Sequence, residues 1–327
     1  MKTLIKGIFQ FIVTIFILSI VVFYMSRLSP GDPLKAYYGD SVERMGLEQR
    51  EKAIDNLGLN KPIYIQYESW INNTIKGYFG ISYKYKRNVV EVINEVYKNT
   101  IVLGGLSYVL IFIVALLLGI YSAIHEDKLI DKIIMMIGNI ITCIPSFWMA
   151  IILILIFGVN LKILPTSGAY SIGKVNDIGD RIIHLILPVI VLVISHLWYY
   201  AYMVRNKLLE EMREEYVVLA KAKGLNKYQI IYKHCLRNIM PSFMAIMAVS
   251  TSHILAGTYI VESIFSYPGL GTLAFESAKY HDYNMLMIIS IITGAIVVFS
   301  NFIVKIINSK IDPRVEENGG NSFEFPK

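Results

Sequence analysis

The sequence predicts an all-α integral membrane protein that crosses the bilayer six times. Hydrophobic residues make up 55% of the 327 positions and charged residues 17%, whereas soluble domains carry about 45–50% and about 25%. The mean hydropathy is +0.52, which excludes an intrinsically disordered chain. The apolar residues also fall into runs near the roughly 20 residues that a helix needs to cross a bilayer. These runs are Ile8–Met25, Thr100–Ile124, Ile133–Val159, Ile182–Val204, Ile239–Val261 and Met285–Ile307.

The first run is expected to stay in the protein as a membrane helix. Lys2 and Lys6 precede it, as in a signal peptide, but its apolar part is longer than the roughly 7–15 residues of such peptides. The following segment, SRLSPGDP, has no small-x-small cleavage site. The two cysteines, Cys143 and Cys235, lie 92 positions apart, which excludes a disulfide scaffold.

The distribution of Lys and Arg predicts the topology. Eight of them lie in 205–237 and three in 160–181, and short cytoplasmic loops carry the excess of these residues. We therefore expect both termini in the cytoplasm, and we interpret the net charge of +6 as a topology signal, not as nucleic-acid binding. The predicted divisions are a first transmembrane helix (1–25), an extracytoplasmic segment (26–99), a five-helix transmembrane core (100–308) with a cytoplasmic loop (205–240), and a cytoplasmic tail (309–327).

The extracytoplasmic segment is expected to be ordered. SPGDP at 29–33 has turn chemistry, and Asp32 could cap that turn. Ser41–Leu57 predicts a polar helix that the sequence LGLNKP ends. Asn88–Lys98 predicts an amphipathic helix that leads into the second span.

Two prolines interrupt the apolar runs. Pro145 lies inside the third run and Pro188 early in the fourth. Such breaks are tolerated where other helices or a water-filled cavity satisfy the freed carbonyl. They are equally compatible with a path for cargo and with a packing kink. Ala115 and Gly119, four residues apart, allow a close approach of two helices.

The predicted cytoplasmic loop contains two short helices. Glu214–Lys223 predicts the first, and Gly224 is placed to end it in the left-handed conformation. Asn226 and Gln229 have the spacing of a capping box that begins the second helix. Pro241 is the expected joint to the fifth span. The pattern fits either a device that docks into another protein or a basic amphipathic loop that lies on anionic lipid.

This loop resembles that of ABC-importer permeases, in particular the first permease subunit of the dipeptide, oligopeptide and nickel group. YVVLAKAKG, followed by HCLRN and a proline, matches that group's pattern. Val218 and Leu219 depart from the broader importer motif Glu-Ala-Ala-x-x-x-Gly, a departure that is usual for the peptide group. The matching positions are Tyr216, Val217, Ala220, Ala222, Lys223, Gly224, His234, Leu236, Arg237 and Asn238.

Other stretches carry the same resemblance in the same order, from about residue 3 to 314. They are SPGDP at 29–33, IPSFW at 144–148 with LKILPTSG at 161–168, VESIFSYPGLG at 261–271 with HDYN at 281–284, and IDPR at 311–314. The resemblance implies the type I ABC importer permease fold. It also implies a second homologous permease subunit, one or two ABC ATPase subunits, and an extracytoplasmic substrate-binding protein.

In this family the short loop helix sits in a cleft of the ATPase, so the resemblance implies roles for three groups of residues. The ATPase-coupling group is Glu215, Tyr216, Val217, Ala220, Ala222, Lys223 and Gly224. The loop-support group is His234, Arg237, Asn238 and Pro241. Candidate pathway or gate residues are Pro145, Ser146, Phe147, Trp148, Glu262, Pro268 and Gly269.

The chain itself is expected to bind no cofactor and to be no enzyme. It has no G-x-x-x-x-G-K-[ST] phosphate loop, so ATP and Mg would be used by the partner. A secondary transporter would need acidic residues at mid-span, and Glu262 lies only at a margin. An intramembrane enzyme would need a motif such as HExxH or GxSxG, and both are absent.

The cargo stays open between peptides and nickel or a metal chelate. His196 and His253 could coordinate a metal, because imidazole suits nickel. They lie on different spans, and a histidine that packs against a neighbouring helix is the simpler interpretation.

Overall fold

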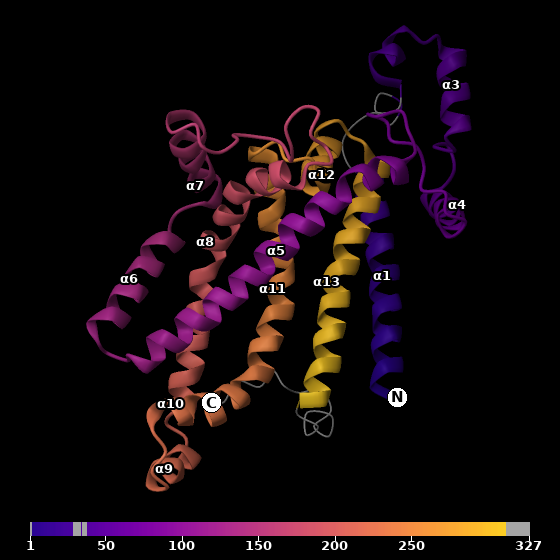
Figure 1. Cartoon of the computed structure of the whole chain (residues 1–327). Helices are drawn as coiled ribbons and strands as arrows, with labels where there is room; N and C mark the ends of the chain where they lie inside the picture. Colours follow the sequence, from indigo (N-terminus) through magenta and orange to yellow (C-terminus); the bar gives the residue numbers. More distant parts are fainter. Residues whose placement is uncertain (1, 29–33, 35–37, 312–327) are drawn as a thin grey trace. The chain divides into compact units, whose positions relative to one another are not determined.

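Helices are the main secondary structure in the part of the chain that the computed structural model describes, which is residues 2–28, 34 and 38–311. Outside the helices, that part contains one isolated antiparallel bridge, between Ile81 and Asn88. Five helices are long and apolar enough to cross a membrane, and a bent helix pair makes a sixth span if it is counted as one. The predicted all-α membrane fold is confirmed (Figure 1).

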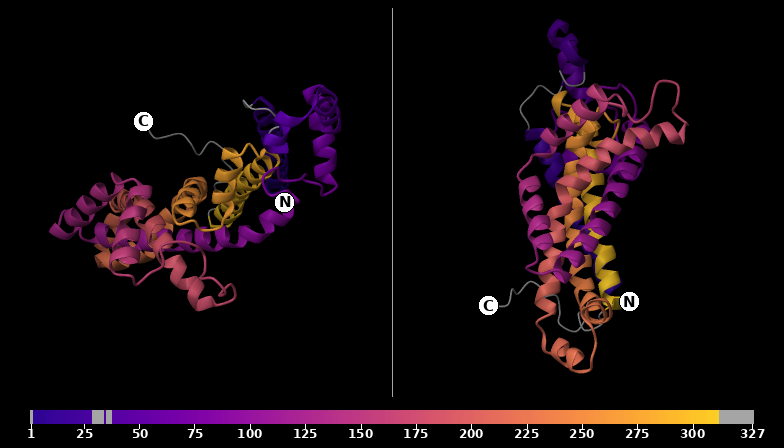
Figure 2. Two further views of the ribbon diagram at one scale, coloured as in Figure 1. Left: turned by 90° about the horizontal axis from the view of Figure 1, so that it is seen from above. Right: turned by 60° about the vertical axis from the view of Figure 1, so that its left-hand side comes forward.

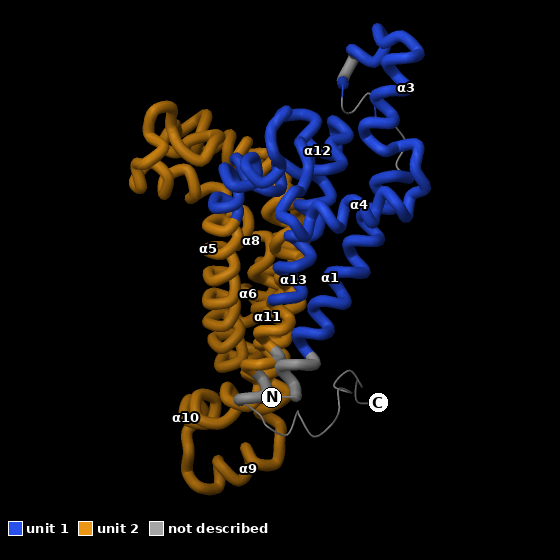
Figure 3. Tube along the Cα trace, turned by 90° about the vertical axis from the view of Figure 1, so that its right-hand side faces the viewer, with its two compact units in different colours: residues 1–100, 268–299 blue, residues 101–267, 300–327 orange. Residues whose placement is uncertain are grey.

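The backbone divides into two compact units (Figure 3). Unit 1 comprises 1–100 and 268–299, and unit 2 comprises 101–267 and 300–327. In unit 1 lie α1 (Lys2–Leu28), the 3₁₀ helix η1 (Gly39–Arg44), α3 (Leu47–Asn56), α4 (Ile63–Ile75), α12 (Leu270–Lys279) and most of α13 (Tyr283–Ile311). Helix α5 (Val89–Ile124) begins in unit 1 and continues into unit 2.

A polar cluster joins the segment before α5 to α12 and to the start of α13 within unit 1. Ser82 donates a hydrogen bond to the buried carboxylate of Asp282. Lys84 and Tyr85 both donate to the carboxylate of Glu276. Burial raises the pKa of Glu276, but these two hydrogen bonds and the charges of Lys84 and Lys279 together outweigh burial and lower the pKa below its ordinary value.

Unit 2 packs around α8 (Ile178–Glu211). A Cβ at Gly119 of α5 would lie 2.6 Å from the Val204 side chain of α8, so only glycine allows this approach, as the small-residue spacing predicts. The ring of Phe112 lies 4.8 Å from that of Tyr200 and 5.8 Å from that of Phe243. The other elements of unit 2 are α6 (Leu129–Thr142), α7 (Ser146–Leu153), the π-helix η2 (Ile154–Asn160), α9 (Glu215–Ala222), α10 (Lys227–Ile230), the π-helix η3 (Ile231–Cys235) and α11 (Leu236–Ile264).

The predicted third span is broken into two pieces. Helix α6 ends at Thr142, and α7 begins at Ser146 after a bend of 96°. Pro145 is the N-cap of α7, and it stops α6 because proline has no N–H and its ring clashes with the preceding turn. Pro188 causes no such end and lies inside α8.

Three further predictions need correction or refinement. The polar helix expected over Ser41–Leu57 is divided at Gly46, which is the N-cap of α3. The amphipathic helix expected before the second span is continuous with it in α5. Pro241 lies inside α11, so it is not a joint between helices. SPGDP with Asp32, and IDPR beyond Ile311, lie outside the described residues.

Candidate coupling site

Helix α9 ends in the motif that the sequence predicts. Gly224 has φ +81°, and its N–H donates to the Lys221 carbonyl at 2.9 Å. The next N–H, of Leu225, donates to the Ala220 carbonyl at 3.2 Å. These two bonds form a Schellman motif with glycine at its left-handed position. Figure 1 and Figure 2 show α9 beyond the ends of the long helices of unit 2.

The second loop helix begins at the predicted capping box. The Asn226 side chain accepts from the Gln229 N–H at 2.9 Å, and the Gln229 side chain accepts from the Asn226 N–H at 3.0 Å. Between α9 and α10 the chain therefore turns in a fixed geometry. Lys227 then donates to the carbonyl of Ile124, the last residue of α5, at 2.6 Å.

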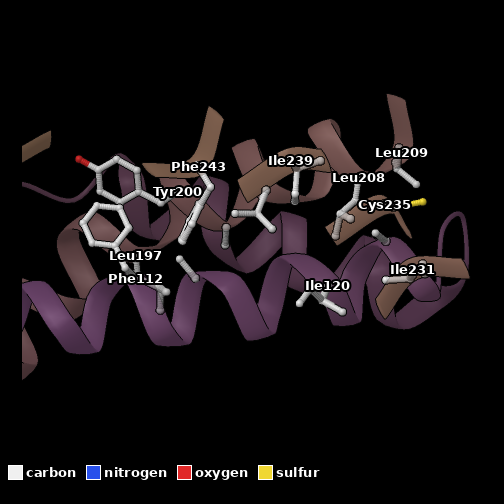
Figure 4. Close-up of a cluster of buried hydrophobic side chains, with 14 of the residues drawn as sticks. Phe112, Ile120, Leu197, Tyr200, Leu208, Leu209, Ile231, Cys235, Ile239 and Phe243 are labelled. Atoms are coloured by element: carbon white, nitrogen blue, oxygen red, sulfur yellow. The ribbon is translucent and has the colours of Figure 1, made fainter. Parts of the chain in front are cut away.

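One face of α9 is locked into the core of unit 2. Val217 is 1% exposed and Ala220 6%, and both belong to the apolar cluster that contains Leu208, Ile231 and Cys235 (Figure 4). These two predicted coupling residues therefore pack inside their own chain. Their burial in this cluster holds α9 against α8 and η3.

The carboxylate of Glu211 links three helices, α8, α9 and α11. Glu211 Oε1 accepts from the Tyr216 hydroxyl at 2.8 Å and from Asn238 Nδ2 at 2.8 Å. Burial, with the hydrogen bonds to its neighbours, raises the pKa of Tyr216, so the hydroxyl keeps its proton as a donor. The predicted support residues His234 and Arg237 are exposed, and the His234 ring lies 6.4 Å from the ring of Tyr216.

The opposite face of α9 exposes two large aliphatic side chains. Val218 is 64% exposed and Leu219 57%. The predicted coupling residues Glu215, Ala222 and Lys223 are exposed as well. An exposed apolar pair on an anchored helix is a surface that can dock into an apolar pocket.

A buried ion pair holds the turn between α5 and α6 near this loop. Asp131 is 2% exposed and accepts from Arg205 Nε at 2.7 Å and Arg205 Nη2 at 2.6 Å. Its carboxylate also accepts from the Ser122 hydroxyl and from the Asp127 N–H. Asp127 has φ +64°, and this bond helps to hold its left-handed conformation.

Glu211, Asp131 and Arg205 are not among the functional residues that the sequence predicts. A signal for the ion pair exists in the sequence, because ionisable residues at span margins are expensive unless they pair. Which two of the many marginal charges would meet depends on the packing of α6 against α8. No local pattern shows that packing.

The candidate gate residues lie in different environments. Phe147 and Trp148 are 49% and 51% exposed, whereas Glu262 near the end of α11 is fully buried. The Tyr267 N–H donates to the Glu262 carbonyl at 2.8 Å. In unit 1, Gly269 is the N-cap of α12, and the carbonyl of Pro268 accepts from Asn99 at 2.8 Å.

The two span histidines come nearer each other than the sequence could establish. The ring of His196 lies where a Cβ on Gly257 would be 2.7 Å away, and Gly257 is one turn from His253. His196 Nδ1 donates to the Leu192 carbonyl at 2.9 Å. Within the part of the chain that the structure describes, no three His, Cys, Asp or Glu side chains gather as metal ligands would.

Two family models match most of the chain. Residues 1–104 match the model described as the N-terminal part of a membrane component of binding-protein-dependent transport systems. Residues 115–317 match the model described as "Binding-protein-dependent transport system inner membrane component".

Several named relatives match nearly end to end. The oligopeptide transport system permease protein AppB of Bacillus subtilis (strain 168) is 33% identical, over 91% of this chain and 94% of AppB. The oligopeptide transport system permease protein OppB of Haemophilus influenzae is 30% identical, over 96% and 99%. The metal-staphylopine import system permease protein CntB of Staphylococcus aureus (strain Mu50) is 29% identical, over 97% and 98%.

A solved structure has the same fold. An inward-facing structure of the MetNI methionine ABC transporter matches with a TM-score of 0.54 over 68% of this chain and 97% of that chain. The sequence identity is 15%, so the match supports the fold alone.

Proposed function

The chain belongs to the inner-membrane components of binding-protein-dependent transport systems, and we propose that it is the peptide-conducting permease subunit of an ATP-driven importer. AppB and OppB are named as oligopeptide permeases. Peptides are therefore the cargo that the relatives favour.

The observation that carries the coupling role is the exposed face of α9. Val218 and Leu219 point away from the core that holds Val217 and Ala220. A helix of eight residues is too short to be stable alone, so the anchored face and the Schellman motif keep it formed. The exposed aliphatic pair can then enter a cleft of the partner ATPase as a preformed surface, at little cost in ordering.

The rest of the assembly follows from this role. One or two kinds of ABC ATPase subunit would use ATP and Mg, and this chain would bind neither. A second homologous permease subunit would complete the pathway, and an extracytoplasmic binding protein would deliver the peptide. The loop that carries α9 would face the cytoplasm, as would both termini, in keeping with the concentration of Lys and Arg in 205–237.

Substitution of the exposed pair tests the docking role. Leu219→Asp should lower the amount of ATPase that co-purifies with the tagged chain by about tenfold or more, because a charge cannot enter an apolar docking pocket without a partner. Tyr228→Asp is the matched control, since Tyr228 is 56% exposed on α10 in the same loop, and it should retain the ATPase.

Equal retention of the ATPase by both variants would overturn the docking role. Equal loss from both, with weaker binding of the purified chain to anionic liposomes, would instead indicate a loop that lies on lipid. Membrane levels of each variant, measured by blotting, separate failed docking from failed insertion.

A metal chelate is the second candidate cargo, because CntB is named as a metal-staphylopine permease. A competition assay of uptake distinguishes the peptide from the metal chelate as cargo. Uptake of a labelled tripeptide that excess unlabelled peptides suppress, and that a nickel chelate leaves unchanged, supports the peptide proposal. The reverse pattern supports the chelate.

A further inference from the structure

Glu211 is the last residue of α8, a position that does not favour a carboxylate. The C-terminus of a helix carries a partial negative charge, so an acidic side chain there destabilises the helix. The last turn of α8 nevertheless carries Glu210 and Glu211 and no basic residue. The stability of α8 alone gives no reason for Glu211, and the reason lies instead in its contacts with other helices.

Two hydrogen bonds connect Glu211 to two other helices of unit 2. Its Oε1 atom accepts from the Tyr216 hydroxyl on α9 and from Asn238 Nδ2 on α11, each at 2.8 Å. The two donors lie five and 27 positions from Glu211 in the chain. One carboxylate oxygen therefore holds together the C-terminal end of α8, the short helix α9 and the beginning of α11.

These hydrogen bonds give direction to a contact that is otherwise apolar. Val217 and Ala220 hold α9 against unit 2 by apolar packing, which is non-directional. A hydrogen bond weakens steeply when its angle becomes unfavourable. The two hydrogen bonds of Glu211 therefore fix the position of α9 relative to α8 and α11 more sharply than apolar packing alone.

The carboxylate lies where two long helices meet the loop. Helix α8 has 34 residues and α11 has 29, and both belong to candidate membrane spans. Figure 1 shows α9 below the lower ends of α8 and α11. Tyr216 lies on the same eight-residue helix as the exposed pair Val218 and Leu219. A displacement of that pair therefore reaches both spans through one carboxylate.

We infer that Glu211 is a positioning residue of the coupling step, which passes the displacement of α9 by the ATPase to α8 and α11 together. This inference rests on the proposed function, because it requires an ATPase that docks on Val218 and Leu219. Hydrogen-bond networks and rigid helices carry energetic coupling between distant sites, and Glu211 joins both. Loss of the carboxylate leaves the docking surface in place, so ATP hydrolysis continues while its link to transport weakens.

The ratio of ATP hydrolysed to labelled tripeptide transported tests this inference, because a residue that only supports folding lowers both rates and leaves their ratio unchanged. Each variant is reconstituted with its co-purifying subunits and the binding protein. Glu211→Ala removes both hydrogen bonds, and Tyr216→Phe removes only the bond to α9. Glu211→Gln keeps an oxygen that can accept both bonds. Glu210→Ala is the matched control, because exposed Glu210 pairs with Lys207 of the same helix at 2.8 Å.

Glu211→Ala and Tyr216→Phe should raise the ratio about fivefold or more, whereas Glu211→Gln and Glu210→Ala should stay within about twofold of the unaltered chain. The amount of bound ATPase, measured by blotting, should be the same in all four. An unchanged ratio in Glu211→Ala, with the ATPase still bound, would overturn the inference and leave the proposed function standing. Loss of the ATPase from Glu211→Ala would also overturn it, and would show that Glu211 only keeps α9 in place. Absence of an ATPase from the unaltered chain would overturn the proposed function and this inference with it.

Discussion

Replacement of Gly224 isolates one physical property, the left-handed backbone at the end of α9. A Cβ on this residue would meet nothing within 4 Å, and φ is +81°. The cost of a side chain is therefore conformational and not steric. It is about 1–2 kcal/mol for most residues, smaller for asparagine, which tolerates this region, and larger for a β-branched residue such as valine.

The size of this conformational cost sets the expected order of uptake among the variants. Each 1.4 kcal/mol changes an equilibrium about tenfold, and α9 has only eight residues, so it has little helical stability of its own. We expect Gly224→Asn to keep at least about half of the uptake, Gly224→Ala to reduce it several-fold, and Gly224→Val to reduce it by more than about tenfold. The amount of protein in the membrane should stay the same.

Two assays follow the series together. ATP-dependent uptake of a labelled tripeptide into proteoliposomes measures function, and hydrogen exchange of the α9 amides measures whether the helix is formed. Faster exchange in α9 should accompany each loss of uptake. Normal uptake by the valine variant would refute the reasoning. Equal inactivity of all three variants, with unchanged exchange, would show that the glycine acts by something other than its φ angle.

Three further predictions concern an ion pair and a helix contact in unit 2 and a carboxylate in unit 1. Asp131→Asn should destabilise the protein by up to about 3 kcal/mol, because it leaves Arg205, whose side chain is only 15% exposed, without its counter-charge. Glu126→Gln, at a more exposed pair of 3.4 Å, should cost less than about 1 kcal/mol. Thermal unfolding of the two variants compares these costs. Gly119→Ala should cost about 1–3 kcal/mol by overpacking α5 against α8, and an unchanged melting temperature would contradict the packing. Because the pKa of Glu276 is lowered, its contribution to stability should be present above pH 4.5 and be lost as the pH falls through the lowered value, so wild type and Glu276→Gln should converge in acid.

The features that the sequence predicts best are those set by neighbouring residues. Gly224 and the Asn226–Gln229 pair act within one turn, so their types and spacing are sufficient to predict a Schellman motif and a capping box. The long apolar runs are equally local, because roughly 20 apolar residues have few alternatives to a membrane span.

The features that the sequence does not predict depend on packing between helices. Leu219 is an apolar neighbour of buried Ala220 in the sequence, yet it is 57% exposed, because α9 is short and only its Val217 side meets the core. Pro145 predicts a break, but the 96° bend depends on what surrounds α7. Helices α4 and α12 have 13 and 10 residues and lack the long apolar runs that predict the spans.

The hydrogen bonds of Glu211 also depend on packing, so the sequence does not predict them. Its carboxylate receives hydrogen bonds from Tyr216 and Asn238, which are five and 27 positions away in the chain. A single glutamate in a charged loop has no distinguishing pattern. Only the fold of α8, α9 and α11 brings its partners together.

The central claim is that this chain is one membrane subunit of an importer that a separate ATPase drives. The most direct measurement purifies the tagged chain from its own membranes in mild detergent, identifies the proteins that accompany it, and reconstitutes the complex. We predict a related six-span protein, an ATPase with a phosphate loop, and tripeptide uptake that requires ATP and the binding protein. A chain that purifies without partners and still transports when ATP is absent would contradict the account.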